Sequence, residues 1–170
     1  KRYLKMHADC ARNIVLDSSC ERGIGQGGFF GYIDRSKTPD AVIDTDVTVG
    51  EGDNRSIRMK GCGRGGTFMY RVVGVKPGDV YAVFFSTKGY PISAQLAWLE
   101  NGAFRWNIPV VRMPMAIENA AGWRTCARVV RAPIEGNYNE MYLMVDMPGS
   151  RANDVAWIDN VYVYKIKEAK

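Results

Sequence analysis

The feature that most constrains this chain is a series of short segments in which apolar and polar residues alternate, with almost no helical periodicity. A period of two places successive side chains on opposite faces of a strand. Glycine, proline, asparagine and aspartate separate the segments, and these residues favour turns. The segments predicted as strands are 13–19, 42–49, 56–61, 67–75, 79–87, 93–100, 122–130, 139–147 and 155–166.

Many short strands in a chain with 18 glycines and 7 prolines predict an all-β sandwich or barrel, and a two-sheet antiparallel β-sandwich fits best. A length of 170 residues suits one domain, so we expect a basic leader or linker at 1–12 and a single module at 13–168. The chain has no initiator methionine and no signal peptide, and we therefore expect a piece of a longer protein.

The composition excludes several classes of protein. A hydrophobic content of 46% and a charged content of 24% are those of a globular domain. No apolar run approaches the roughly 20 residues of a transmembrane helix, so no membrane partner is expected. The net charge of +5 comes mostly from residues 1–12, which contribute +3, rather than from a basic stripe. We therefore expect no nucleic-acid partner.

A second basic segment leaves the charge of a ligand open. It contains Arg105, Arg112, Arg124, Arg128 and Arg131. A solvated face is the simpler interpretation, and an acidic ligand is the alternative.

The histidine and cysteine residues give little support for a metal site or a catalytic site. A single histidine leaves almost nothing for a histidine-based metal site or a Ser-His-Asp triad. The cysteines at 10, 20, 62 and 126 lack the CxxC spacing of zinc sites, and they allow up to two disulfides if the protein is exported.

The last predicted strand contains a carboxylate in its middle. In AWIDNVYVYKI (156–166), Asp159 has the same parity as Val161 and Val163, which we interpret as core residues. Asp159 is therefore predicted to point inward. A buried carboxylate needs a cation, an arginine or several hydrogen-bond donors.

Five segments along the chain match a known pattern in order and with compatible spacing. They are NIVLDSSCERG (13–23), VVGVKPGDVYAVFFSTKG (72–89), LAWLENG (96–102), WRTCARVVRAP (123–133) and WIDNVYV (157–163). Together they resemble the jelly-roll carbohydrate-binding modules of families 4, 9, 16 and 22, although the chain has Cys20 where these modules commonly have an aromatic residue. The resemblance covers roughly residues 13 to 166 and implies a jelly-roll β-sandwich that binds a polysaccharide or oligosaccharide without catalysis.

The same resemblance implies a structural calcium ion between the chain ends. Glu21 and Asp159 match the carboxylates that hold it in such modules, and carbonyl groups of the loop 50–56 would complete the shell. Calcium prefers oxygen ligands of this mixed kind. In the alternative, backbone N–H groups or an arginine satisfy Asp159.

Two surfaces are candidates for binding a sugar, because aromatic faces pack on pyranose rings and planar polar groups bond the hydroxyls. The first is the outer face of one sheet, with Phe84, Tyr142, Arg71 and Gln95. The second is the loop rim. It includes the long segment 104–123 with Phe104, Arg105 and Trp106, the loop 28–34, and Tyr90. Each aromatic residue could instead belong to the core, as we expect for Trp98 and Trp157.

These features favour a non-catalytic module of a secreted or cell-surface bacterial protein. Its covalent partner would be a catalytic module such as a glycoside hydrolase or polysaccharide lyase. The alternative is a structural or adhesive β-sandwich of a cell-surface protein. A jelly-roll hydrolase or lyase is disfavoured, since the carboxylates fall mostly in turns, apart from Asp44 and Asp46.

Overall fold

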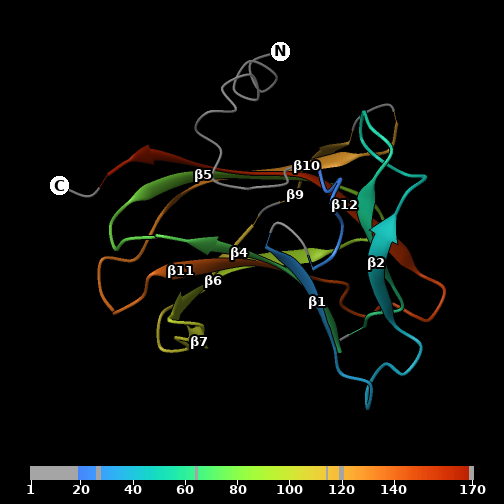
Figure 1. Cartoon of the computed structure of the whole chain (residues 1–170), viewed down its shortest axis with the longest axis horizontal. Coiled ribbons are helices and arrows are strands. Elements are labelled where there is room, and N and C mark those ends of the chain that lie inside the picture. Colours follow the sequence, from blue (N-terminus) through green and yellow to red (C-terminus); the bar gives the residue numbers. More distant parts are fainter. Residues whose placement is uncertain (1–18, 26–27, 64, 114, 119–120, 169–170) are drawn as a thin grey trace.

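The computed structural model describes residues 19–25, 28–63, 65–113, 115–118 and 121–168. The twelve elements in this part of the chain are all β-strands, and every pairing between them is antiparallel. They form two sheets packed face to face (Figure 1), which confirms the predicted β-sandwich.

The first sheet, called here the β11 sheet, has the order β1-β4-β11-β6-β7, and β8 also pairs with β6. Its strands are β1 (Phe29–Ile33), β4 (Gly66–Val73), β6 (Ser93–Glu100), β7 (Ala103–Phe104), β8 (Val111–Arg112) and β11 (Glu140–Asp146).

The second sheet, called here the β12 sheet, has the order β2-β3-β12-β5-β10-β9. Its strands are β2 (Val42–Asp46), β3 (Ser56–Lys60), β5 (Val80–Gly89), β9 (Met115–Glu118), β10 (Arg124–Arg131) and β12 (Val155–Lys167).

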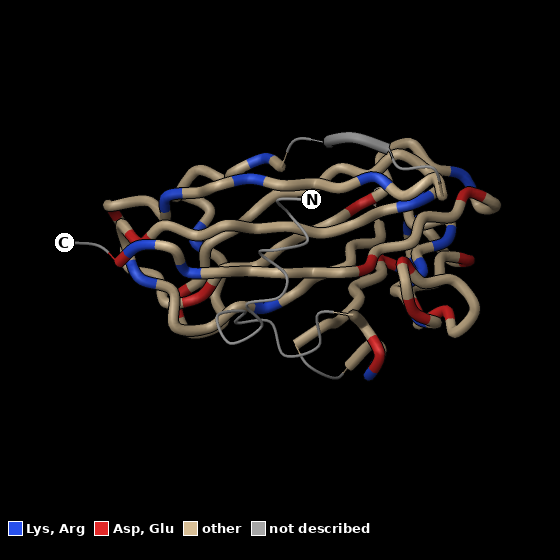
Figure 2. Tube along the Cα trace, turned by 90° about the horizontal axis from the view of Figure 1, so that it is seen from above, with Lys and Arg blue, Asp and Glu red and all other residues tan. Residues whose placement is uncertain are grey.

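The core lies between the sheets and follows the alternation in the sequence. Phe68 and Leu143 from the β11 sheet and Val83 and Phe85 from the β12 sheet are all almost fully buried. Trp98 is only 1% exposed, as expected for a core residue. Acidic residues lie mostly toward the two ends of the sandwich (Figure 2).

The predicted strands agree with the observed ones where both can be compared. Eight of the nine predicted segments coincide with β2, β3, β4, β5, β6, β10, β11 and β12, and residues 13–18 of the ninth lie outside the described residues. Two predictions were wrong. The segment 28–34 contains β1, and the segment 104–123 contains β8 and β9 instead of being a structureless loop. These strands are short and lack a clear alternation.

The three described cysteines, Cys20, Cys62 and Cys126, are buried. Cys62 is a free thiol, so it forms no disulfide with Cys126, and Cys10 lies outside the described residues. Burial raises the pKa of the Cys62 thiol to about 11. In the described part of the chain no helix is long and apolar enough to cross a membrane.

One glycine allows β5 to end against β12. Gly89 has φ of +86°, and a Cβ there would lie 2.4 Å from the carbonyl oxygen of Val155. Gly74 has a similar φ of +74° with open space around its Cβ position. We expect Gly89→Ala to lower the free energy of unfolding by roughly 2–4 kcal/mol, and Gly74→Ala by about 1 kcal/mol from backbone strain alone. Urea unfolding midpoints of the two variants would measure both effects, and equal losses would contradict a specific contact at Gly89.

Candidate functional site

The outer face of the β11 sheet gathers several of the predicted sugar-binding residues. Tyr142 on β11 is directly opposite Arg71 on β4, and Met144 is directly opposite Gln95 on β6. Directly opposite residues in an antiparallel pair point to the same face. Because their neighbours Leu143 and Leu96 are fully buried, Tyr142, Arg71 and Gln95 point away from the core.

Four aromatic side chains form a continuous line on this face, called here the aromatic row. Phe30 packs edge-on against Tyr142 at a ring-centroid distance of 5.4 Å, and Tyr142 meets Phe104 edge-on at 5.5 Å. Phe104 and Trp106 are stacked, with centroids 4.5 Å apart and ring planes 10° apart. Trp106 is 68% exposed, so it presents a free aromatic surface.

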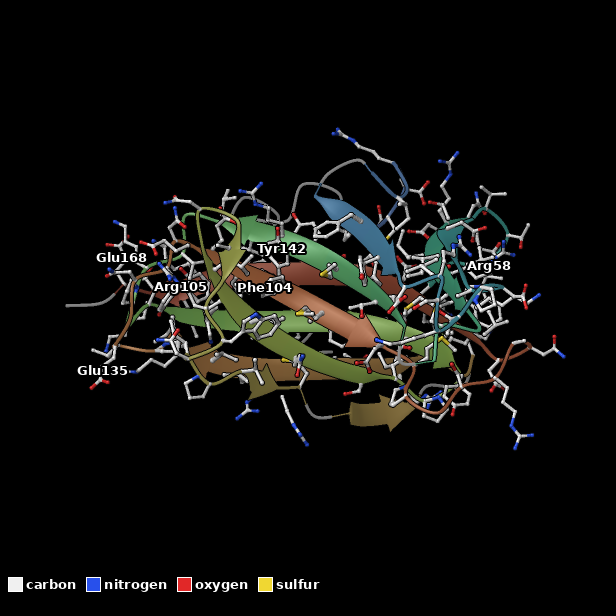
Figure 3. All side chains as sticks on the ribbon, turned by 90° about the horizontal axis from the view of Figure 1, so that it is seen from below. Arg58, Phe104, Arg105, Glu135, Tyr142 and Glu168 are labelled. Carbon is white, nitrogen blue, oxygen red and sulfur yellow. The ribbon has the colours of Figure 1, made fainter. Side chains whose placement is uncertain are left out.

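The aromatic row joins the two surfaces that the sequence analysis treated separately. Phe104 belongs to β7, which pairs with β6, and Phe104 is directly opposite Leu99. This short strand carries Phe104 across the sheet edge toward Tyr142. Figure 3 shows the two rings over the same sheet, toward the end of the sandwich where Arg105 and Glu135 lie.

Two arginines beside the aromatic row are already paired with carboxylates. Arg71 donates from Nε and Nη2 to Glu140, at 2.9 and 2.6 Å, and these bonds raise the pKa of Arg71. Glu140 is buried, whereas the Arg71 side chain is 45% exposed. Arg105 pairs with Glu100. The charge of both arginines is therefore largely balanced within the protein.

Phe84 does not belong to this face, and its predicted exposure was wrong. It lies on β5 of the β12 sheet and is only 7% exposed, in a small cluster with Ala82 and Tyr164. The alternation correctly places Phe84 on the outer side of its strand, but other groups cover that side. Phe84 therefore offers no free ring to a ligand.

Tyr90 and Trp157 also lie apart from the aromatic row. Tyr90 is partly buried against the core, and its hydroxyl donates to the Pro148 carbonyl. Trp157, which we expected in the core, is only partly buried, and its Nε1 donates to Asp46. Its direct neighbours Ala156 and Ile158 are the inward residues of that part of β12.

Asp159 is buried, as predicted, but it faces the other way. The register of β12 against β5 shifts by one residue between Asp159 and Tyr162, and Asn160 has φ of +49°. This bulge turns Asp159 to the side of Ser86, which is the outer face of the β12 sheet. Parity counted from Val161 was therefore misleading.

Two backbone N–H groups donate hydrogen bonds to the Asp159 carboxylate, and one of them belongs to the loop that follows β2. The N–H of Glu51 donates to Oδ2 at 2.7 Å, and the N–H of Asn160 donates to Oδ1 at 2.6 Å. Burial raises the pKa of Asp159 to about 8, and the charges of Asp53 and Glu51 also raise it, against the lowering effect of the two N–H groups.

The structure gives Glu21 a different neighbour from the one expected. Its carboxylate lies 3.7 Å from Nε of Arg55, which also donates to the Glu21 carbonyl. Among the described residues no three or more His, Cys, Asp or Glu side chains are grouped closely enough to hold a metal ion. The acids Glu51 and Asp53 are close enough to raise the pKa of Asp159, and carboxylate and carbonyl oxygens are the ligands that calcium prefers.

Asp44 and Asp46, the two acids of β2, both interact with the Arg58 side chain. Arg58 makes two bonds to Asp44, at 2.9 and 2.7 Å, and lies 3.9 Å from Asp46. Asp46 also accepts bonds from Thr48 and Trp157, and these bonds keep its pKa below the usual value despite the opposing effect of burial. Both acids are therefore engaged in structural contacts.

Sequence reasoning misplaced one member of the site and missed another. Phe30 was expected in the loop 28–34 of the rim, whereas it lies on β1, because the FFGY segment alternates poorly. Glu140 was not singled out, although its place two residues before Tyr142 puts it on the same face of β11. Strand parity could have identified Glu140.

The fold is that of the jelly-roll carbohydrate-binding modules, with similar structures from families 4, 16, 22 and 61. No family model matches the chain, and no curated protein matches it in sequence. At 10–17% identity, the structural similarity establishes the fold alone.

Three solved structures illustrate the similarity. The enzymatically active domain of tailspike protein 4 of bacteriophage CBA120 has a TM-score of 0.68 and 15% identity, covering 91% of this chain and 21% of that one. The tandem family 22 modules of Paenibacillus barcinonensis Xyn10C have a TM-score of 0.65 and 13% identity, covering 86% and 48%. The module TmCBM61 in complex with β-1,4-galactotriose has a TM-score of 0.55 and 17% identity, covering 91% and 99%. The chain thus spans about a fifth of the tailspike chain and about half of the Xyn10C chain.

Proposed function

We propose that this chain is a non-catalytic carbohydrate-binding module that binds a polysaccharide or oligosaccharide along the aromatic row. The observation that carries the proposal is the line of touching rings on an outer sheet face, ending in the 68% exposed Trp106. Large exposed aromatic surface in a soluble domain marks a binding site. Gln95 and the exposed part of Arg71 lie on the same face and can bond sugar hydroxyls.

The balanced arginines favour an uncharged glycan. An anionic sugar would have to compete with Glu140 for Arg71 and with Glu100 for Arg105. Breaking the first pair would leave the buried Glu140 carboxylate without its partner, which is costly. Neutral hydroxyls can accept bonds from the exposed edge of the same guanidinium group without this cost.

A wider context is part of the proposal. The chain would act as a module of a secreted or cell-surface protein, next to a catalytic module that degrades the bound glycan. The short share of the tailspike and Xyn10C chains that it spans supports a place within a larger protein.

A structural calcium ion completes the proposal. Asp159 and backbone oxygens of the loop 50–56 would hold it, and it would neutralise the buried carboxylate and tie β12 to the loop. The pKa of Asp159, raised to about 8 by burial and by neighbouring acids, supports a cation at this position.

Affinity gel electrophoresis against paired neutral and acidic polysaccharides tests the binding function. We expect retardation by a neutral polysaccharide, little change between 50 and 300 mM salt, and no release of new reducing ends. Salt-sensitive retardation by uronic or sulfated chains would contradict a neutral ligand. No retardation by any polysaccharide would contradict the binding function itself, and new reducing ends would indicate an enzyme.

A further inference from the structure

A preformed cavity lies at the end of the sandwich next to the aromatic row. Its volume is about 540 Å³, within the range of small-ligand pockets. Two loops form it, one after β7 and one between β10 and β11. The lining residues are Asn107, Ile108, Pro109, Pro133, Ile134, Glu135 and Gly136.

Buried aromatic residues hold both walls of the cavity in place. Trp98 Nε1 donates to the Pro109 carbonyl at 3.1 Å, and the Tyr138 hydroxyl donates to the Pro133 carbonyl. The Trp98 and Tyr138 rings pack together at a centroid distance of 5.1 Å. Each of these two rings therefore fixes one of the two loops. The cavity thus belongs to the rigid part of the fold, and it needs little ordering when a ligand binds.

The floor of the cavity depends on close contact between the two loops. Ile108 is buried, and a Cβ at Gly136 would lie 2.6 Å from Ile108 Cδ1. Gly136 also has φ of +106°, which other residues rarely adopt. The absence of a side chain at Gly136 therefore lets the Ile108 side chain pack directly against the second loop.

The chemistry of the lining suits a sugar residue. Pro109, Pro133 and the 72% exposed Ile134 provide apolar surface for C–H groups, while Asn107 and Glu135 provide an amide and a carboxylate for hydroxyls. The Glu135 charge disfavours uronic and sulfated sugars. Asn107 directly follows Trp106, so the cavity adjoins the exposed end of the aromatic row.

We propose that this cavity is an additional sugar subsite, which binds an uncharged residue of the same glycan chain beyond the one stacked on Trp106. This proposal rests on the proposed function of the aromatic row. It predicts that affinity rises with chain length, because short oligosaccharides occupy the row and longer ones also reach the cavity.

Calorimetric titration with cello-, xylo- and β-1,4-galacto-oligosaccharides of two to six residues tests the subsite. The variants are Glu135→Gln and Asn107→Ala, and Asp40→Asn is the control, since Asp40 is an exposed acid in a loop far along the chain. We expect both cavity variants to lose about 5- to 20-fold in affinity for the longest bound oligosaccharide and to keep their affinity for the shortest. Asp40→Asn should change neither.

The outcomes separate this proposal from the one on which it rests. If the unmodified protein binds none of the oligosaccharides and no polysaccharide retards it in electrophoresis, the proposed function fails and the subsite fails with it. If Trp106→Ala weakens binding but the cavity variants keep the full dependence on chain length, the subsite is wrong and the function stands. Equal losses for short and long oligosaccharides would also overturn it, because the cavity would then not be an additional subsite.

Discussion

Replacing Trp106 with alanine is expected to weaken binding of the neutral glycan by about 30-fold, equivalent to about 2 kcal/mol. Trp106 is 68% exposed and stacks on Phe104, which in turn packs against Tyr142. The variant removes the largest free aromatic surface of the row and leaves the core unchanged. Calorimetric titration of the polysaccharide identified by electrophoresis would measure the loss.

The rest of the row allows the effect to be separated from folding. Tyr142→Leu keeps an apolar side chain on the face but removes the ring, and a loss of about tenfold in affinity is expected. Val129→Ala is a suitable control, because Val129 is 62% exposed on β10 of the β12 sheet. All three variants should unfold at nearly the same temperature as the unmodified protein.

Phe84 provides the sharpest comparison between an aromatic residue in the site and one outside it. Phe84→Leu should lower thermal stability and leave affinity unchanged, since Phe84 is buried in the opposite sheet. If Phe84→Leu weakened binding as much as Trp106→Ala, the aromatic row would not be the binding surface.

The sequence determined most of the fold, because strands buried on one face carry a period-two signal. The segment 93–100 matches β6 residue for residue, and Trp98 lies in the core as the alternation predicts. The signal fails where strands are very short. Val111–Arg112 has two residues, too few to show a period, and only its pairing with β6 makes it a strand.

The sequence predicted part of one face of the site but not the assembly of the site. Parity placed Tyr142 on the outer side of its strand, and in the structure Arg71 and Gln95 lie on the same face. Parity could not show which sheet contains Phe84, because strand order depends on contacts between distant segments. For the same reason, the stacking of Phe104 and Trp106 toward Tyr142 could not be derived from the sequence.

Asp159 shows how one local irregularity defeats a periodic argument. A bulge adds one residue to a strand, and it reverses the face of every residue on one side of it. The positive φ of Asn160 allows the bulge, and asparagine adopts that conformation more readily than most residues. The asparagine after Asp159 was therefore a sequence signal of the bulge, which the alternation of apolar and polar residues does not show.

Removing calcium is expected to lower the melting temperature by about 5–10 °C. Saturating an ion site at about a hundred times its dissociation constant contributes about 2.7 kcal/mol, and a chain of this size shifts by about 2–4 °C per kcal/mol. Thermal unfolding with 2 mM calcium and with chelator would measure the difference. Asp159→Asn should unfold at the same temperature in both conditions.

Two results would contradict the calcium proposal. The first is a melting temperature of the unmodified protein that does not change with chelator. The second is a calcium-dependent shift that survives in Asp159→Asn, because the ion would then bind elsewhere. Glu21→Gln serves as a matched control, since the Glu21 carboxylate lies against Arg55. A small effect in this variant would confirm that Glu21 is not essential to the site.

The pH dependence of stability gives an independent measure of the same carboxylate. In chelator, the pKa of Asp159 is about 8 in the folded protein, against about 3.9 in the unfolded chain. Between these values the folded state binds the extra proton, so stability falls as pH rises, by at most about 1.4 kcal/mol per pH unit. Below pH 4 and above pH 8 the contribution of Asp159 becomes flat. Asp159→Asn should lack this slope, and calcium should suppress it in the unmodified protein by holding the carboxylate ionised. Urea midpoints at pH 5, 6, 7 and 8 would test the prediction, and identical slopes for both proteins in chelator would refute it.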